Sequence, residues 1–171
     1  RSSGSHAGHA ARWDLTGGGS MIRQGCHPLT AVLYLKRVEA AARGEQIKVT
    51  SVTCETGNIA AGLPEEQKKY IQARPVDVED WSMLTLSFSD GTKATVFAGD
   101  FVLGGGRNLI ETFTNGGVLE ANIVPNSGMI GYFTDETKLA EITIREKVDR
   151  KTGWQFVTVA ESWTRGYISE I

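Results

Sequence analysis

Cysteine is almost absent from this chain: Cys26 and Cys54 are the only two among 171 residues. Small secreted domains that depend on disulfides carry several pairs, so a disulfide scaffold is excluded and a reduced, cytoplasmic setting is expected. The two cysteines and the three histidines also match no common zinc-binding spacing. No metal site is therefore predicted.

Long hydrophobic runs and basic runs are missing as well. No stretch approaches the roughly 20 apolar residues that cross a bilayer. The first ten residues, RSSGSHAGHA, lack the apolar centre of a signal peptide. The net charge is −2, and lysine and arginine form no run that could follow phosphates. The sequence thus predicts no membrane insertion and no nucleic-acid partner.

Residues 28–43 show the spacing of an amphipathic helix, with charged residues on one side. The apolar residues toward the other side are Leu29, Val32, Leu33 and Leu35. Pro28 suits the first helical position and Gly44 suits a helix stop, so a helix over 28–43 is predicted.

Most of the remaining sequence predicts strands. The clearest pattern is an alternating hairpin around Asp90-Gly91, followed by a second hairpin around Asn115-Gly116. Both pairs suit a two-residue type I′ turn, because that turn needs positive φ at both positions. Further strands are predicted at 47–55, 129–134, 139–146 and 154–160, with a possible short helix at 64–73.

These elements predict an α+β fold: an open, largely antiparallel mixed β-sheet with helices packed on one face. The length favours a single domain over 1–171. The chain begins within a loop and stops after an aromatic segment, so we interpret it as a fragment of a longer protein. The uncovered sheet face can remain in water or cover a partner.

Three segments resemble the Gfo/Idh/MocA oxidoreductases, the glucose-fructose oxidoreductase and inositol dehydrogenase family. GGGSMIRQGCHPLTAVLYLK is similar to the start of the family's second domain, where a glycine-rich turn and a D-x-G-x-H stretch precede an apolar helix. VEDWSMLTLSFSDGTKATV and NLIETFTNGGVLEANI resemble the two hairpins that follow. The resemblance covers about residues 13–171.

The resemblance implies a substrate-binding and oligomerising domain of an oxidoreductase acting on a sugar, polyol or related hydroxy compound. The cofactor, NAD or NADP, would lie mainly on an N-terminal Rossmann domain that also carries the family's catalytic lysine. Neither the G-x-G-x-x-G fingerprint nor its βαβ context occurs here. The family also implies homo-oligomers formed through the sheet.

His27 is the candidate catalytic residue, because the family's histidine aligns with it. A residue before proline avoids the α region, so His27 is expected at the helix N-cap, where the positive helix end disfavours imidazolium. A neutral histidine can move a proton or hydrogen-bond a substrate hydroxyl. Without the resemblance, a structural cap or a core histidine is the simpler interpretation.

Arg23 stands where the family usually carries an aspartate that works with the histidine. Residues four apart share a helix face, so Arg23 is expected to point at the same pocket as His27. A guanidinium cannot replace the acid, but it can hold a carboxylate or phosphate. The predicted substrate-binding residues are Arg23, Gly18 and Gly19. The alternatives are a solvent-facing arginine and a plain glycine loop.

Two hypotheses of different classes follow. The first is the substrate side of an NAD(P)-dependent oxidoreductase, with a sugar-like or anionic substrate. The second is a non-catalytic binding or oligomerisation module that kept the fold, which the missing aspartate favours. The sequence leaves open whether late aromatic residues such as Tyr132 and Trp154 line a sugar pocket or an oligomer interface.

Overall fold

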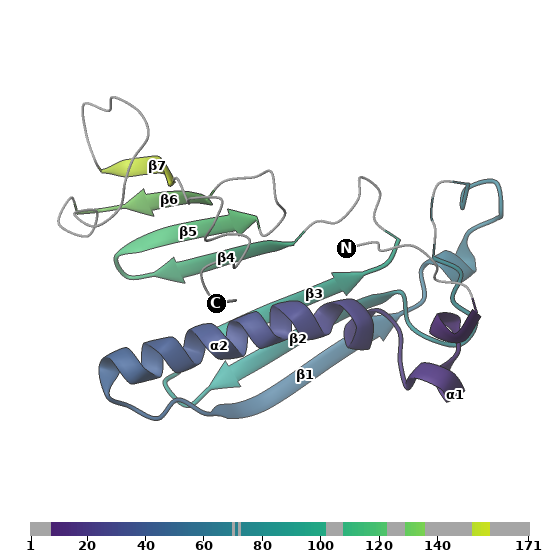
Figure 1. Cartoon of the computed structure of the whole chain (residues 1–171), viewed down its shortest axis with the longest axis horizontal. Helices are drawn as coiled ribbons and strands as arrows, with labels where there is room; N and C mark the ends of the chain where they lie inside the picture. The colour runs from purple at the N-terminus through teal and green to yellow at the C-terminus, as the bar shows by residue number, and fades with distance from the viewer. Residues whose placement is uncertain are drawn as a thin grey trace, which may run out of the picture. The chain divides into compact units, whose positions relative to one another are not determined.

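A computed structural model of the chain describes residues 8–69, 71, 73–101, 108–122, 129–135 and 152–157. The chain divides into two compact units, Arg1–Gly105 and Gly106–Ile171, and each is described by itself (Figure 1). That the two units make up one domain stays a prediction.

The first unit contains one long helix and a three-stranded antiparallel sheet of order β1-β2-β3 (Figure 1). Its helical elements are η1 (Gly8–Ala11), α1 (Trp13–Thr16), the π-helical turn η2 (Met21–Gly25), α2 (Cys26–Arg43) and η3 (Ala60–Gly62). Its strands are β1 (Val49–Gly57), β2 (Trp81–Phe88) and β3 (Lys93–Gly99). One long helix on an antiparallel sheet confirms the predicted α+β class.

The core of this unit lies between α2 and one face of the sheet. Its buried residues are Leu84, Leu86, Phe88 and Val96, and α2 packs Leu29 and Val32 against them. The register places Leu84 opposite Val96. The period-two alternation predicted for this hairpin is therefore confirmed, because side chains that alternate along a strand point to opposite faces.

Two local predictions in this unit are wrong. The turn after β2 contains three residues, because the Phe88 N–H donates to the Thr92 carbonyl at 3.0 Å. Gly91 has a φ of 85° there, so the loop needs its glycine but is one residue longer than a type I′ turn. The described part of 64–73 forms turns rather than a helix, beginning with a bond from the Gln67 N–H to the Pro64 carbonyl.

The second unit is a four-stranded antiparallel sheet of order β4-β5-β6-β7. Its strands are β4 (Leu109–Thr114), β5 (Gly117–Asn122), β6 (Met129–Phe133) and β7 (Gly153–Val157). Asn115 and Gly116 join β4 to β5, as predicted, since Thr114 pairs with Gly117. The strand predicted at 139–146 lies outside the described residues.

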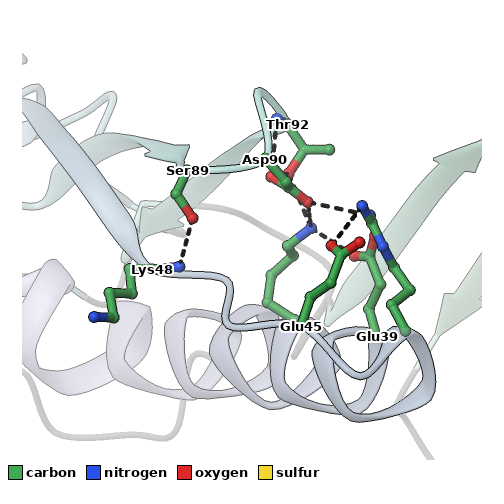
Figure 2. A network of polar contacts seen from close by, with 8 residues as sticks. Glu39, Glu45, Lys48, Ser89, Asp90 and Thr92 are labelled. Carbon is green, nitrogen blue, oxygen red and sulfur yellow. Dashed lines mark hydrogen bonds and ion pairs between the residues drawn. The ribbon is translucent and has the colours of Figure 1, made fainter.

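An ionic network fastens the C-terminal half of α2 to the turn between β2 and β3. Lys36 Nζ lies 2.8 Å from Asp90 Oδ2, 2.9 Å from Thr92 Oγ1 and 2.5 Å from Glu39 Oε2. Figure 2 shows Asp90 and Thr92 on that turn above Glu39 of α2 and Glu45, which lies just beyond the helix end. The Lys36 ammonium also lies 5.2 Å from the centre of the Phe88 ring. Lys36 thus connects the helix, the turn and the core.

We expect Lys36→Met to lower the free energy of unfolding by about 1–3 kcal/mol at neutral pH, because the largely buried Asp90 carboxylate loses its nearest cation and keeps only Arg43, at 3.6 Å. Urea denaturation followed by far-ultraviolet circular dichroism measures this. Lys48→Met is the matched control: Lys48 is exposed, its side chain takes part in no polar contact among the described residues, and its backbone N–H donates to Ser89 (Figure 2). That control should change stability by less than about 0.5 kcal/mol.

The contribution of the Lys36–Asp90 pair to the free energy of unfolding should depend on pH, and the sign of this dependence follows from the pKa of Asp90. The hydrogen bond from Lys36, helped by Thr92, holds the pKa of Asp90 well below its usual 3.8. A carboxyl with a lowered pKa stabilises the fold fully well above pH 3.8, and this stabilisation is lost as the pH falls through the folded pKa. The stability gap between the parent chain and Lys36→Met should therefore narrow in acid. A gap that widens below pH 3.8 would contradict this assignment.

Candidate functional site

The glycine-rich segment before α2 has a structural requirement at each position. Gly17 ends α1 with a φ of 70°, and Gly18 has a φ of 155°. Gly19 approaches another backbone so closely that a Cβ there would lie 1.9 Å from the Glu79 carbonyl oxygen. The segment is therefore a tight connection between α1 and the long helix, with no room for side chains at its last position.

Glu79 caps the start of the long helical run with both its side chain and its backbone. Its carboxylate accepts the Gly19 N–H at 2.8 Å and the Met21 N–H at 3.1 Å, and its carbonyl accepts the Ser20 N–H at 2.9 Å. Three N–H groups that the helix leaves without internal partners are thereby satisfied. Glu79 lies in the segment VEDW that carried the family resemblance, but sequence reasoning gave it no role.

His27 is not at the helix N-cap, so that prediction is wrong. It is the second residue of α2, and helical structure already begins before it with the π turn η2. A proline inside a helix clashes with the carbonyl four residues earlier and has no N–H to offer it. The wider π turn, which ends at Gly25, contains the carbonyl of Gln24 four residues before Pro28, and it accommodates this defect while His27 stays helical.

His27 points away from the sheet. Leu29 packs into the core, and residues two apart in a helix are separated by about 200°, so His27 lies on the opposite side of α2. Its side chain is exposed and forms no hydrogen bond within the described residues. Ala31, Tyr34 and Val38 follow it at positions i+4, i+7 and i+11, and Tyr34 is 63% exposed. His27 therefore stands at the N-terminal end of a largely apolar helix face that the described residues of the first unit leave uncovered, called here the outer α2 face.

Arg23 makes a different set of contacts from those expected. Its Nη2 donates to Asp100 Oδ2 at 2.6 Å, and its Nη1 donates to the Ala10 carbonyl at 3.2 Å. The arginine side chain is 19% exposed and that of Asp100 only 5%. Arg23 and His27 lie in one helical run, but the prediction that both point at one pocket is wrong: the contacts of Arg23 lead to the end of β3, whereas His27 is exposed on the side of α2 away from the sheet. Binding of a substrate anion stays a prediction for Arg23, and contact with the substrate stays a prediction for Gly18 and Gly19.

Buried polar groups surround this ion pair. Asp80 accepts the Ile59 and Ala60 N–H groups at 2.7 Å each, and its carbonyl accepts the Asp100 N–H at 2.9 Å. The hydroxyls of Ser20 and Ser82 share a buried hydrogen bond of 2.8 Å. The hollow that Arg23, Glu79, Asp80 and Asp100 help to line has room for about one water molecule. The polar residues around this hollow hold η2 in place, and the hollow itself is too small for a sugar.

Other kinds of site have little support in the part of the chain that the structure describes. No group of three or more histidine, cysteine, aspartate or glutamate side chains there could hold a metal ion. Cys26 and Cys54 are both exposed free thiols. The helices in the described ranges are all too short or too polar to cross a bilayer.

Comparison with known proteins agrees with this architecture. Residues 1–120 match the family model of the GFO/IDH/MocA C-terminal domain. An NAD binding oxidoreductase from Klebsiella pneumoniae has 15% identity and a TM-score of 0.59, over 95% of this chain and 38% of that chain. An oxidoreductase domain protein from Kribbella flavida has 16% identity and a TM-score of 0.57, over 79% and 33% of the two chains.

A third similar structure is GenD2 from gentamicin A biosynthesis in complex with NAD, with 20% identity and a TM-score of 0.52 over 98% of this chain and 40% of that chain. Among curated proteins, none matches the sequence. The chain spans about a third to two fifths of the length of these three structures. At such identities the likeness concerns the fold.

The long helix packed on an antiparallel sheet, with a second antiparallel sheet after it, defines an α+β domain. With residues 1–120 of 171 matched to the model of the family's C-terminal domain, the chain belongs to the Gfo/Idh/MocA family. The resemblance stated from the sequence is thereby confirmed.

Proposed function

We propose that this chain is the substrate-side domain of an NAD- or NADP-dependent oxidoreductase that acts on a sugar, a polyol or a related hydroxy compound. The observation that carries the proposal is the position of His27 at the end of the outer α2 face. An apolar face on a helix that is already packed on a sheet is suited to being covered by another part of a protein. A histidine at the edge of such a contact can reach a substrate held there.

His27 has the chemistry that alcohol oxidation requires. When the hydroxyl-bearing carbon loses its hydrogen as hydride, the hydroxyl oxygen must give up a proton. The nicotinamide, when bound, takes the hydride. The His27 imidazole accepts the hydroxyl proton, or holds it by a hydrogen bond while another base removes it. The imidazole is exposed and forms no hydrogen bond within the described residues, so it can form one with a substrate oxygen.

The cofactor phosphates do not fit the described residues of this chain. A pyrophosphate is typically held by backbone N–H groups at a helix N-terminus. At the start of the long helical run, Glu79 already occupies the N–H groups of Gly19, Ser20 and Met21. A phosphate at this helix start would find the N–H groups already bonded to Glu79, and the negative charge of the Glu79 carboxylate would repel it. We therefore assign cofactor binding mainly to a part of the protein outside this chain.

The chain alone should consequently show no measurable binding of NAD(H) or NADP(H). Calorimetric titration of the 171-residue chain with each cofactor tests this, and the full-length protein, titrated in parallel, should bind at least one of them. Turnover is then sought with NAD⁺ or NADP⁺ and a panel of aldoses, polyols and sugar acids. Micromolar binding by the chain alone would contradict the division of roles.

The proposal includes assembly of copies through the sheet. On the uncovered face of the first sheet, Met83 and Phe97 are paired in register and are 39% and 48% exposed. Trp81 contacts Phe97 edge to face, with ring centres 6.4 Å apart. On the second sheet the cross-strand register brings four large side chains into one row, Phe113, Val118, Tyr132 and Trp154. Exposed aromatic and methionine side chains of this kind are typical of interface cores.

We expect the parent protein to form dimers or larger oligomers and Phe97→Lys to weaken them. An ammonium buried without a partner should cost at least about 2 kcal/mol, which raises the dissociation constant about thirtyfold. Light scattering over a range of concentrations measures the mass. Val76→Lys is the control, because Val76 is 71% exposed and lies in a loop outside the sheet. A monomeric parent protein at all concentrations would exclude assembly.

A non-catalytic binding or oligomerisation module is the second candidate. Arg23 in place of the family's aspartate supports it, and so does the ion pair that binds Arg23 to Asp100. The two candidates differ in the panel assay, since only an enzyme reduces NAD⁺ or NADP⁺ in a substrate-dependent way.

A further inference from the structure

We propose that Asp100 is a positioning residue for His27, acting through Arg23 and the π turn η2; this rests on the proposed function, because it takes His27 as the group that meets the substrate hydroxyl. Asp100 lies 73 positions after His27 in the sequence and directly follows β3. No sequence motif assigns it a role. A chain of contacts connects the sheet to the Asp100 backbone, the Asp100 carboxylate to the Arg23 guanidinium, and Arg23 to the turn of which it is part.

Asp100 is itself held firmly. Its backbone N–H donates to the Asp80 carbonyl at 2.9 Å, and Asp80 in turn caps η3 with its own carboxylate. The Asp100 side chain is 5% exposed, so its carboxylate has little freedom to move. It therefore presents a fixed negative charge at the end of β3. A charge-assisted bond to such a group is short and directional, as the 2.6 Å to Arg23 Nη2 indicates.

Arg23 links the fixed carboxylate of Asp100 to the start of the long helix. It is the middle residue of η2, and its guanidinium also donates to the Ala10 carbonyl of η1 at 3.2 Å. The two contacts tie the centre of the π turn to β3 and to η1. Glu79 holds the beginning of the run through Gly19 and Met21. At its end Gly25 is buried between Met21 and Ala98, where a Cβ would lie 2.4 Å from Met21 Sδ.

A π turn is rare and occurs mostly as a single turn inside an α-helix, so we expect contacts from outside the helix to support it. It accommodates about one more residue per turn than an α-helix, and one residue corresponds to about 100° of rotation. The later part of α2 cannot rotate freely, because Leu29 and Val32 are packed on the sheet. A change in the turn must therefore be absorbed between Gly19 and His27. His27 lies between the turn and the first packed residue, Leu29, so its direction depends on the helix and also on the geometry that Asp100 and Arg23 impose on the turn.

Nuclear magnetic resonance of the 171-residue chain tests this link without a substrate. In Asp100→Asn, the amides of residues 23–27 should exchange with solvent about ten to a hundred times faster, because the charged bond that holds the turn is weakened. Their carbon shifts should move toward regular α-helical values. The signals of β1 and β2 should stay unchanged. Unchanged exchange and shifts at 23–27 in a folded Asp100→Asn chain would overturn the proposal.

Asp90→Asn is the matched control. Asp90 is also a largely buried carboxylate paired with a cation of the long helix, Lys36. Lys36, however, lies nine residues after His27, far from the π turn. Asp90→Asn should lower stability without changing exchange or carbon shifts at 23–27. Equal changes there in both variants would mean that general destabilisation, not positioning, is responsible, and would overturn the proposal.

A double variant covers the case in which Asp100→Asn does not fold. Replacing both partners of a buried ion pair with apolar residues often leaves stability unchanged, so Arg23→Met with Asp100→Leu keeps the site filled without its charges. The same local changes at 23–27 are expected, at nearly parental stability. Parental exchange and shifts in this variant would overturn the proposal.

Kinetics separate positioning from a merely structural role. In the full-length protein, with NAD⁺ or NADP⁺ and a substrate found in the panel of aldoses, polyols and sugar acids, Asp100→Asn should lower kcat about tenfold to a hundredfold with KM changed less than twofold. A purely structural loss lowers the amount of folded protein and leaves kcat per folded molecule intact, and that result would overturn the proposal. If His27→Ala retains full activity, the proposed function fails, while the resonance experiment still decides whether Asp100 fixes the turn.

Discussion

His27→Ala in the full-length protein is expected to lower kcat by about 10²–10⁴-fold, the range for loss of a general acid or base. The fold should hardly change. The His27 side chain is exposed, faces away from the sheet and forms no hydrogen bond within the described residues, so its removal should cost less than about 0.5 kcal/mol. A large loss of rate without a loss of stability is the signature of a functional residue on a surface.

Cys26→Ala is the control for this prediction. Cys26 adjoins His27 in α2 and is also exposed, and within the described residues its thiol makes one long contact, of 3.7 Å to the Arg23 carbonyl. It should retain parental kcat and KM. Steady-state rates of both variants, measured at equal concentrations of folded protein, decide the matter. If His27→Ala turns over as fast as Cys26→Ala, His27 has no part in the reaction.

Arg23 adds a second readout to the same assay. If a substrate carboxylate or phosphate shares or displaces Asp100 at the guanidinium, Arg23→Ala should mainly raise KM for anionic substrates. If Arg23 only holds η2, the variant should lower kcat for all substrates alike. If Arg23→Asp turns over neutral sugars and sugar acids as fast as the parent protein does, Arg23 has no role in substrate binding.

Local rules predicted the elements that depend on local chemistry. The helix stop at Gly44 needs only a residue that adopts positive φ, and Gly44 has a φ of 66°. The hairpin of β2 and β3 follows from alternation, because one face packs on α2 and the other does not. In these places, residues close in sequence determine the structure.

Long-range contacts could not be predicted in the same way. Glu79 caps a helix that starts about 60 residues earlier, and Asp100 pairs with an arginine 77 positions away. No spacing rule joins such residues, because the sheet brings them together only after folding. The π turn was missed for the same reason: the rule that a residue before proline avoids the α region is a local preference, and the contacts of Arg23, Glu79 and Gly25 override it.

Gly19→Ala is expected to destabilise the first unit by about 2–4 kcal/mol, the range for a core position that cannot accept extra atoms. A Cβ at Gly19 would lie 1.9 Å from the Glu79 carbonyl oxygen and 2.9 Å from its carbon, and both are backbone atoms. One of the two chains must move. Any such movement stretches the bond from the Ser20 N–H to the Glu79 carbonyl and the bonds from Gly19 and Met21 to the Glu79 carboxylate.

Two other glycines provide a graded control. Gly17 has a φ of 70° with open space around it, so Gly17→Ala should cost about 1 kcal/mol for the left-handed backbone alone. A Cβ at Gly62 would meet nothing within 4 Å and its φ is not positive, so Gly62→Ala should change stability by less than about 1 kcal/mol. Urea denaturation followed by circular dichroism should rank the three variants in this order, because α2 dominates the helical signal of the described chain.

The outcome at Gly19 also tests its predicted contact with substrate. If its role is only to let the chain pass close to Glu79, the folded fraction of Gly19→Ala should retain parental kcat and KM. A variant that folds with parental stability but loses substrate affinity would instead support a pocket wall at Gly19, and it would contradict the close approach as the reason for the glycine. If Gly19→Ala lowers the free energy of unfolding and also raises KM, the glycine turn is needed to place Arg23 as well, because η2 begins only two residues after Gly19.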